Sequence, residues 1–378
     1  MSGGKKIGFY TAGPPFEGDS LEREALGGSE TAFIQAARAL ARRGCQVTAF
    51  NGCKRPGLYH GVAYHAFADS LPLLARECFD VFVVSRYCAF FNLPFQANLK
   101  VLWNHDTLDN PKELRAVHDE IDIFLVLSAF HRDNFLIRLP QLDDRLIVTR
   151  NGLDFNLLDR SASAARDPHK LIYASRPERG LKTLLEDIWP RLYRSNPDLR
   201  LHICGYKPQL ENLPDQLADL YRHIDVLMET TPGLTLLGGL TKEDYYRHLS
   251  ESAMMLYPST FPEVSCLAAL EAQALGVPVL TSDAFALAES VVAASMKVGG
   301  RPGSPGYVND YVERALSLLR NPETLAGIGR ESKEIIRSRY GWDHVTAEWD
   351  RIFDLGLRAK NNREIVLETR PEANDRRH

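Results

Sequence analysis

The stretch LYPSTFPEVSCLAALEAQALGVPVLTSD, residues 256–283, contains the end of one strand, a loop, a helix and a second strand. Apolar and β-branched residues at its two ends are typical of buried strands, and the segment rich in Ala and Leu between them is typical of a helix. Two strands joined through a helix form a βαβ unit, whose strands lie parallel in one sheet. The stretch therefore predicts a parallel α/β fold, which binds ligands at the carboxyl ends of its strands.

The same alternation of short apolar runs and helical segments continues on both sides of this unit and forms two arrays. Strands are predicted at residues 7–11, 46–50, 62–66, 81–85, 100–104, 123–127 and 146–149, and then at 170–174, 199–204, 234–237, 254–257 and 278–281. Helices are predicted at residues 29–42, 181–194, 307–320 and 322–339. The fold class is therefore α/β, with two doubly wound, Rossmann-like domains.

Small, polar and proline residues between Leu158 and His169 indicate a linker. We expect an N-terminal Rossmann-like domain at residues 1–165 and a C-terminal one at 166–339. A helix at residues 340–360 is expected to pack back on the first domain. Residues 361–378 are expected to form a polar tail, because the sequence is polar and expected to fray beyond Arg358. The natural ligand site is the cleft between the domains.

The composition limits the functional classes. With 44% hydrophobic and 25% charged residues in 378, the chain is an average globular protein of two domains. Its 45 Lys and Arg against 49 Asp and Glu lack the basic excess of a nucleic-acid-binding protein. Six cysteines without a C-x-x-C motif favour reduced thiols over disulfides or a zinc site. Without an apolar signal region or a run of about 18 apolar residues, a cytoplasmic location is expected. Peripheral association with the inner face of a membrane stays open.

Two carboxylates stand eight positions apart in the opening stretch. If the helix begins near Ser265, Glu263 lies in the preceding loop and Glu271 lies about two turns inside, roughly 9 Å further along the axis. The free backbone N–H groups between them form the positive end of a helix, which suits a diphosphate. The alternative is ordinary: one glutamate near an N-cap and the other on a solvated helix face.

The stretch at 256–283 resembles the E-x7-E signature of retaining glycosyltransferases of family four. The segment GGLTKEDYYRHLSESAMMLYPS, which precedes and overlaps it, also resembles that family, and the similarity extends from about residue 5 to residue 355. The resemblance implies the GT-B fold, with two facing Rossmann-like lobes. It also implies that the N-terminal domain faces the acceptor and the C-terminal domain binds the nucleotide sugar.

The resemblance also implies roles for single residues of this motif. Glu271 would bind the ribose hydroxyls, and Glu263 would bind the hydroxyls of the transferred sugar and stabilise charge at its anomeric carbon without acting as a covalent nucleophile. Backbone donors to the diphosphate would come from Val264, Ser265, Cys266 and Leu267.

A second motif supplies cations. The run ASRPERGLK, residues 174–182, follows a predicted strand and opens a helix, where cations suit phosphate oxygens. It resembles the family's Arg and Lys pair that neutralises the diphosphate, with an altered spacing. Arg179 before Gly180 matches best, and Arg176 and Lys182 share the second role. The alternative is a solvated turn.

Further candidates come from the N-terminal array. Gly27 and Gly28 open its first long helix and allow a phosphate to approach the backbone closely. The polar loop at residues 13–26 is expected to be a flap on the acceptor side. His105, with Asp106 beside it, ends a strand where the resemblance places a histidine that touches the sugar or acceptor, although a single His is usually structural.

Weaker candidates end other strands toward the cleft. His131 and Asn151 lie in the segments 128–132 and 150–152. Leu240 and its neighbours, with the segment 205–207, are expected near the nucleobase and ribose.

The resulting expectation is a retaining, metal-independent hexosyltransferase of polysaccharide or glycoconjugate assembly. Its donor would be a UDP-, GDP- or ADP-sugar, and its acceptor a hydroxyl of a carbohydrate, a lipid-linked molecule or another compound. No cofactor is expected, because no Asp-x-Asp motif occurs to hold a metal. Alternatives are a sugar-nucleotide epimerase or phosphorylase on the same fold and a non-catalytic partner subunit that binds nucleotide sugars.

Overall fold

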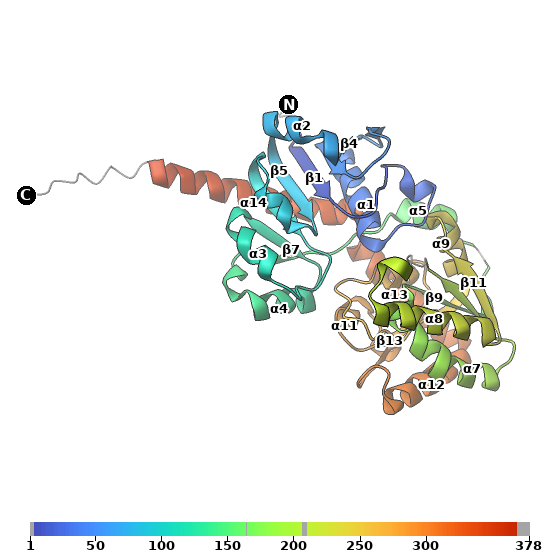
Figure 1. The fold of residues 1–378 in the computed structure, drawn as a ribbon. Coiled ribbons are helices and arrows are strands. Elements are labelled where there is room, and N and C mark those ends of the chain that lie inside the picture. Colours follow the sequence, from blue (N-terminus) through green and yellow to red (C-terminus); the bar gives the residue numbers. More distant parts are fainter. Residues whose placement is uncertain (1–3, 164, 206–209, 369–378) are drawn as a thin grey trace, which may run out of the picture.

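The structure, a computed structural model, describes residues 4–163, 165–205 and 210–368. Two lobes are evident in Figure 1: the N-terminal lobe, residues 4–161, and the C-terminal lobe, residues 167–339. Each lobe has its own sheet with helices on both faces. The predicted α/β class with two doubly wound units is therefore confirmed.

The N-terminal sheet has eight strands in the order β3-β4-β2-β1-β5-β6-β7-β8. All neighbours are parallel except the short edge strand β3, which is antiparallel to β4 and which the sequence patterns did not reveal. The strands are β1 (Lys6–Thr11), β2 (Gln46–Asn51), β3 (Gly57–Tyr59), β4 (Val62–Ala66), β5 (Cys78–Ser85), β6 (Gln96–Trp103), β7 (Ile123–Val126) and β8 (Leu146–Val148).

The C-terminal sheet has six parallel strands in the order β11-β10-β9-β12-β13-β14. The strands are β9 (Asp167–Ala174), β10 (Arg200–Cys204), β11 (Leu234–Gly238), β12 (Ser252–Tyr257), β13 (Val279–Ser282) and β14 (Lys297–Val298). In both sheets the strand order reverses beside the first strand, at β1 and at β9, and such a reversal opens a crevice for a ligand.

The helices include the four that the sequence predicted, with ends shifted by a few residues at most. A π-helical turn, Leu184–Ile188, joins α6 to α7 within one of them. The N-terminal lobe contains α1 (Gly28–Arg42), α2 (Leu71–Arg76), α3 (Lys112–Val117), α4 (Ala129–Arg138) and α5 (Phe155–Ser161). The remaining helices are α6 (Leu181–Thr183), α7 (Trp189–Ser195), α8 (Asp215–Thr230), α9 (Lys242–Ser250), α10 (Leu267–Ala274), α11 (Leu287–Ser290), α12 (Pro305–Leu319), α13 (Pro322–Arg339) and α14 (Trp342–Glu368).

The connection between the lobes is shorter than the sequence indicated. Helix α5 extends to Ser161, and β9 begins at Asp167, so only residues 162–166 lie between them. Leu158 explains the difference, because its fully buried side chain gives the start of the expected linker an apolar contact that holds it in a helix.

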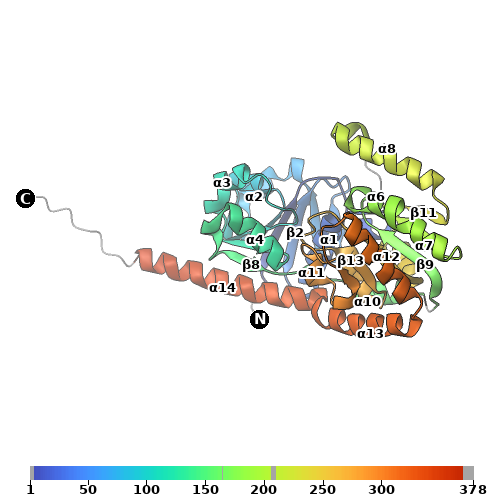
Figure 2. The same ribbon diagram turned by 90° about the horizontal axis from the view of Figure 1, so that it is seen from below.

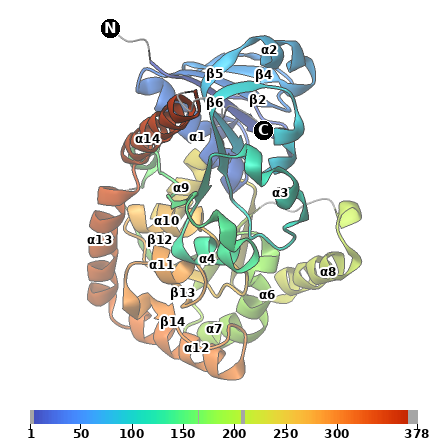
Figure 3. The same ribbon diagram turned by 90° about the vertical axis from the view of Figure 1, so that its left-hand side faces the viewer.

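Helix α14 returns from the C-terminal lobe to the N-terminal lobe, as Figure 3 shows. The indole of Trp342 donates to Gln35 on α1 (2.8 Å), and that of Trp349 donates to Thr149 (2.8 Å). Gly356 packs against the side chain of Leu99. Contrary to the expected fraying beyond Arg358, the helix continues to Glu368 and extends past the lobe (Figure 2), and residues 369–378 lie outside the described part.

Candidate functional site

A cavity of about 880 Å³ lies between the lobes, at the carboxyl ends of the strands of both sheets. This volume is near the upper end of the range for ligand sites, roughly 300–1,000 Å³. The N-terminal lobe contributes the start of α1 and the turns after β5 and β6. The C-terminal lobe contributes the turns after β9, β10, β11 and β12 and the first turns of α9 and α10.

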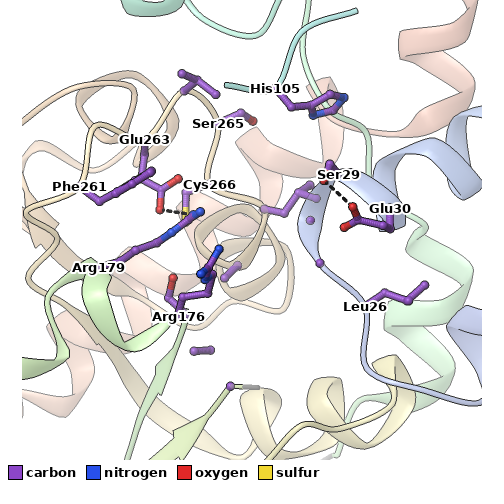
Figure 4. Close-up of a pocket in the computed structure, with 18 of the residues that line it drawn as sticks. Leu26, Ser29, Glu30, His105, Arg176, Arg179, Phe261, Glu263, Ser265 and Cys266 are labelled. Atoms are coloured by element: carbon purple, nitrogen blue, oxygen red, sulfur yellow. Dashed lines mark hydrogen bonds and ion pairs between the residues drawn. The ribbon is translucent and has the colours of Figure 1, made fainter. Parts of the chain in front are cut away.

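Glu263 lies in the loop after β12, as predicted, and is 4% exposed. Its Oε1 accepts hydrogen bonds from the guanidinium of Arg179 (2.9 Å) and from the hydroxyl of Tyr257. Figure 4 shows the Arg179 and Glu263 side chains meeting on one side of the pocket. Burial lowers the pKa of Arg179, but the Glu263 carboxylate more than offsets this, so the pKa is raised and the guanidinium stays charged.

Gly180 fixes the position of Arg179. Its φ of +115° is in the left-handed region, and a Cβ there would lie 2.3 Å from the carbonyl oxygen of Pro258. Only glycine permits this approach of the two loops. The strand-to-helix turn after β9 therefore packs directly against the loop after β12 that carries Glu263.

Glu271 is 2% exposed, so the alternative of a solvated helix face is wrong. Its Oε1 accepts from Lys242 (2.5 Å) and from the hydroxyl of Tyr246 (2.8 Å), both on α9. Because α10 begins at Leu267 and not near Ser265, Glu271 lies about one turn inside the helix, not two. Residues 264–266 are irregular and line the cavity before the helix begins.

Lys242 lines the cavity and was not among the residues singled out in the sequence. The available signal was its place at the start of α9, inside the segment GGLTKEDYYRHL. Its spacing from Glu271 follows no local pattern, because the contact joins two helices through the fold.

The backbone between the two glutamates also lines the cavity, through Val264, Ser265, Cys266 and Leu267. N–H groups at the start of a helix have no preceding turn to bond to, so they can bind an anion. Asn151, after β8, donates to the Ser265 hydroxyl (3.3 Å) and so contacts this segment from the N-terminal side.

The three predicted cations separate in the structure. Arg176 and Arg179 line the cavity, and Arg176 Nε lies 2.8 Å from Glu178 Oε1. Lys182 does not contribute to the lining. Its half-exposed side chain pairs with Glu186 at 3.8 Å, one turn along the same helical segment, so the structure does not bring it to the site. Residue spacing alone could not show which face of the first helical turn the Lys182 side chain occupies.

Gly27 and Gly28 both line the cavity at the N-terminus of α1. A Cβ on Gly28 would lie 3.5 Å from the Leu267 side chain, so the two lobes approach closely here. The prediction of a flap at residues 13–26 is wrong for the middle of this loop. Phe16 and Leu21 are buried, and only Pro14, Ala25 and Leu26 from this loop line the cavity.

His105 and Asp106 line the cavity after β6. The His105 ring packs on Trp103 with centroids 4.3 Å apart, and its Nε2 is buried without a partner. Burial, together with the nearby positive charge of Arg86, holds the pKa of His105 well below its usual value. The imidazole is therefore neutral near pH 7.

His131 does not contribute to the lining but supports the turn that does. Its Nδ1 accepts the N–H of Leu127 (3.1 Å), so the proton is on Nε2, which donates to the carbonyl oxygen of Asp106 (2.9 Å). Burial lowers the pKa of His131 to about 4 and keeps the ring neutral.

Arg86 is a second cavity residue that the sequence did not reveal. It follows β5 with a φ of +71°, which is unusual for a residue with a side chain. Its guanidinium makes two hydrogen bonds to Asp106 (2.6 and 3.1 Å) and one to the Ser29 hydroxyl (3.2 Å).

The candidates for the nucleobase end lie partly within the lining. Leu240 and Gly205 line the cavity beside Lys242, while Tyr206 and Lys207 lie outside the described residues.

Comparisons with known proteins agree with this arrangement. Residues 168–321 match the family described as Glycosyl transferases group 1. The chain is 24% identical over 198 residues to a lipopolysaccharide 1,2-N-acetylglucosaminetransferase of Salmonella typhimurium, covering 51% of this chain and 50% of that protein. It is 28% identical over 240 residues to a glycogen synthase of Mycobacterium tuberculosis, covering 62% and 54%. The chain thus spans about half the length of the curated relatives it matches.

Solved structures are similar over nearly the whole chain. A sucrose-phosphate synthase from Thermosynechococcus elongatus has a TM-score of 0.71 at 14% identity, covering 94% of this chain and all of that one. Anabaena Alr3699/HepE in complex with UDP and glucose has a TM-score of 0.69 at 16% identity, covering 93% and 99%. At these identities the likeness establishes the fold, and the predicted GT-B fold is confirmed.

None of the described helices is both long and apolar enough to cross a bilayer.

Proposed function

We propose that this protein transfers a hexose from a nucleoside diphosphate sugar to an acceptor hydroxyl, with retention of the anomeric configuration. The observation that carries the proposal is the pair of buried carboxylates, Glu263 and Glu271, on either side of a helix N-terminus that opens into the cavity between the lobes. The match of residues 168–321 to Glycosyl transferases group 1 covers both of them.

Each part of the donor has a matching group in this arrangement. The Glu271 carboxylate, held through Oε1 by Lys242 and Tyr246, would accept the ribose hydroxyls with its second oxygen. The N–H groups at residues 264–267 would hold the diphosphate. Glu263, held by Arg179 in the same way, would accept hydroxyls of the transferred sugar.

Catalysis in this proposal is mostly electrostatic. Arg176 and Arg179 neutralise the charge that develops on the departing diphosphate, and the start of α10 adds its dipole. Attack occurs on the face from which the diphosphate leaves, and a diphosphate oxygen accepts the proton of the acceptor hydroxyl. Glu263 accepts hydrogen bonds from Arg179 and Tyr257. Because these bonds stabilise its negative charge, the carboxylate is better suited to binding and charge stabilisation than to nucleophilic attack.

Metal independence belongs to the same proposal and rests on the two guanidinium groups and the missing Asp-x-Asp motif. The donor nucleotide is UDP, GDP or ADP. The Anabaena structure bound to UDP and glucose and the similarity to a glycogen synthase support a nucleotide hexose as the class.

The first experiment is thermal unfolding of the purified protein with UDP, GDP, ADP and their hexose conjugates. A ligand at 100 times its Kd adds about 2.7 kcal/mol of stability, which shifts the melting temperature by several degrees. The best ligand is then tested with Glu271→Ala. Stabilisation of the wild type that is lost in the variant supports the donor class and the ribose contact. Failure of every nucleotide to stabilise the wild type contradicts the proposal.

Steady-state kinetics then separate the two glutamates. Glu271→Ala is expected mainly to raise the donor KM, because the ribose is remote from the reacting bond. Glu263→Ala is expected mainly to lower kcat, because its contact is strongest in the transition state. Equal small effects of both changes on both constants would contradict these roles. NMR of the first-formed product shows the anomeric configuration, and inversion would refute the retaining mechanism.

A further inference from the structure

The charged side chains of the cavity are divided unequally between its two sides. The C-terminal wall carries three cations and two carboxylates: Arg176, Arg179, Lys242, Glu263 and Glu271. The N-terminal wall carries three carboxylates and one cation: Glu30, Asp106, Asp109 and Arg86. Among the described lining residues, positive charge is thus in excess where the donor is proposed to bind and negative charge is in excess on the opposite side.

Arg86, the single cation among the described residues of the N-terminal wall, already has several partners within the protein. Arg86 makes two hydrogen bonds to Asp106 and one to Ser29, and Glu30 lies 3.7 Å from its Nη1. The ring of Tyr87 lies 5.4 Å from the guanidinium carbon. Arg86 is shared between two carboxylates, and Asp109 adds a third to the same wall, so the described N-terminal lining keeps an excess of negative charge that disfavours an anion.

Other polar groups of this wall remain open to a ligand with hydroxyl groups. The Asp109 side chain is 80% exposed, receives one hydrogen bond from Thr107 (3.1 Å) and lies 3.9 Å from Arg138, which is outside the lining. Glu30 is buried at the first turn of α1, across the pocket from Glu263 (Figure 4). Its Oε1 accepts a hydrogen bond from the Ser29 hydroxyl (3.1 Å), so its second oxygen is the one proposed to meet a ligand. Carboxylates accept hydrogen bonds only, and sugar hydroxyls donate them.

The unpartnered nitrogen of His105 is an independent sign of a missing ligand. A buried polar atom without a partner costs about 1–3 kcal/mol, so most buried polar atoms are hydrogen-bonded, and an unpartnered one in a residue that lines a cavity is a candidate for contact with a ligand. Nε2 of His105 is such an atom in a residue that lines the cavity. A neutral imidazole can donate a hydrogen bond to a hydroxyl or accept one from it. A phosphate, because of its negative charge, would instead favour the protonated, charged imidazolium.

Charge repulsion selects against anionic acceptors. An anion at this wall would face Glu30, Asp106 and Asp109, and also the diphosphate of the bound donor. In a cleft with low-dielectric walls these repulsions are focused and not fully screened. Like charges opposite a ligand are a common way of rejecting the wrong one.

We infer that the N-terminal wall binds an uncharged carbohydrate acceptor and rejects acceptors that carry a phosphate or carboxylate close to the reacting hydroxyl. The inference rests on the proposed function and names the class of its second substrate. Asp109, Glu30 and His105 bind the acceptor hydroxyls, and the Arg86–Asp106 pair shapes the wall between them.

Saturation-transfer NMR tests this inference with matched probes. Neutral disaccharides (maltose, cellobiose and lactose) are compared with glucose 6-phosphate, glucuronic acid and cellobiouronic acid, with the stabilising nucleoside diphosphate present. The neutral probes are expected to bind, and the anionic probes to bind at least about tenfold more weakly, since each like charge at 5–7 Å in a solvated cleft contributes a severalfold penalty. High salt should reduce the difference, because it screens charge.

A charge-reversal variant with a matched control shows whether the charge of this wall causes the selectivity. Asp109→Lys should bring the anionic probes to within about threefold of the neutral ones. Asp119→Lys, an equally exposed position that does not line the cavity, should leave the ratio unchanged. Anionic probes that bind as well as neutral ones, neutral probes that do not bind, or an unchanged ratio in Asp109→Lys would each overturn the inference.

The proposed function fails separately, in the thermal unfolding experiment with nucleotides. If no nucleotide stabilises the protein, the NMR comparison is made on the free protein and still reports the charge selectivity of this wall. If a nucleotide stabilises the protein but the anionic probes bind best, only the acceptor class is wrong.

Discussion

The two walls of the cavity hold their charged groups in different ways. On the C-terminal wall, Glu263 and Glu271 are almost fully buried, and each receives a cation and a tyrosine hydroxyl on the same oxygen. On the N-terminal wall, the Asp106 carboxylate is half exposed in its pair with Arg86. Buried pairs have fixed geometry because breaking them leaves an unpaired charge in a poorly solvated site, whereas exposed pairs rearrange cheaply. The molecule thus combines a rigid donor side with an acceptor side that can rearrange at the exposed carboxylates Asp106 and Asp109, although Glu30 there is buried.

The largest effect is expected from breaking the rigid wall. Arg179→Met leaves the Glu263 carboxylate buried without its cation, so the free energy of unfolding should fall by about 3 kcal/mol. Loss of charge neutralisation should lower kcat/KM by about 10²- to 10³-fold. Urea unfolding and initial rates measure the two effects. Lys182→Met is the matched control and should change both little; an equal loss in it would restore Lys182 to the site.

The turn that carries His105 and Asp106 predicts a pH dependence of stability. The pKa of His131 is lowered from 6.5 to about 4 by burial, so the unfolded chain binds a proton that the folded chain does not between these values. The contribution of the neutral His131 to the free energy of unfolding is complete above pH 6.5. It is lost as the pH falls toward 4, by up to about 3 kcal/mol. Urea unfolding at pH 7.5 and 4.5 should show a smaller difference for His131→Gln than for the wild type. An unchanged difference would count against this protonation state.

A smaller effect is expected where the two lobes are joined beside the cavity. Glu289 on α11 accepts the N–H groups of Ala129 and Phe130, both at 2.8 Å, at the start of α4 in the other lobe. Glu289→Gln removes a charge from a helix N-terminus and should lower the free energy of unfolding by about 1 kcal/mol and change kcat a few-fold. Glu313→Gln, on an exposed face of α12, is the control. Equal results for both variants would mean that this contact does not link the lobes.

No effect is expected from removing metal ions. EDTA should leave the transfer rate unchanged, because Arg176 and Arg179 supply the positive charge at the proposed diphosphate position. Loss of activity that Mg²⁺ or Mn²⁺ restores would contradict this. It would also change the comparison of the walls, since the exposed carboxylates of Asp106 and Asp109 would then be candidates for metal ligands in place of sugar contacts.

The sequence predicted one wall better than the other. The C-terminal candidates lie in two short runs, 174–182 and 261–271, where residue spacing and helix position are linked by local geometry. Lys182 was the exception, because a one-residue change along a helix rotates a side chain by about 100° and no contact was available to choose between faces. The structure places it against Glu186.

The N-terminal wall is assembled from parts of the chain that are distant in sequence. Arg86 follows β5, Asp106 follows β6, and Ser29 opens α1, and their hydrogen bonds span separations that no local pattern encodes. The same reason applies to Lys242 and Glu271, which lie on different helices. A charge pair across the fold has no sequence period, so the Arg86–Asp106 and Lys242–Glu271 pairings could not be found before the sheets were ordered.

The sequence by itself determined the α/β class, the two sheets, the strand ends that carry the site and the order in which Glu263 precedes a helix that contains Glu271. These follow from hydrophobic periodicity and from a motif in one continuous βαβ unit. Only the tertiary structure decided which charges are paired, that Glu271 is buried and that His131 supports the turn that carries His105 and Asp106. Burial and pairing depend on what packs across from a residue, and that is fixed only when the whole chain has folded.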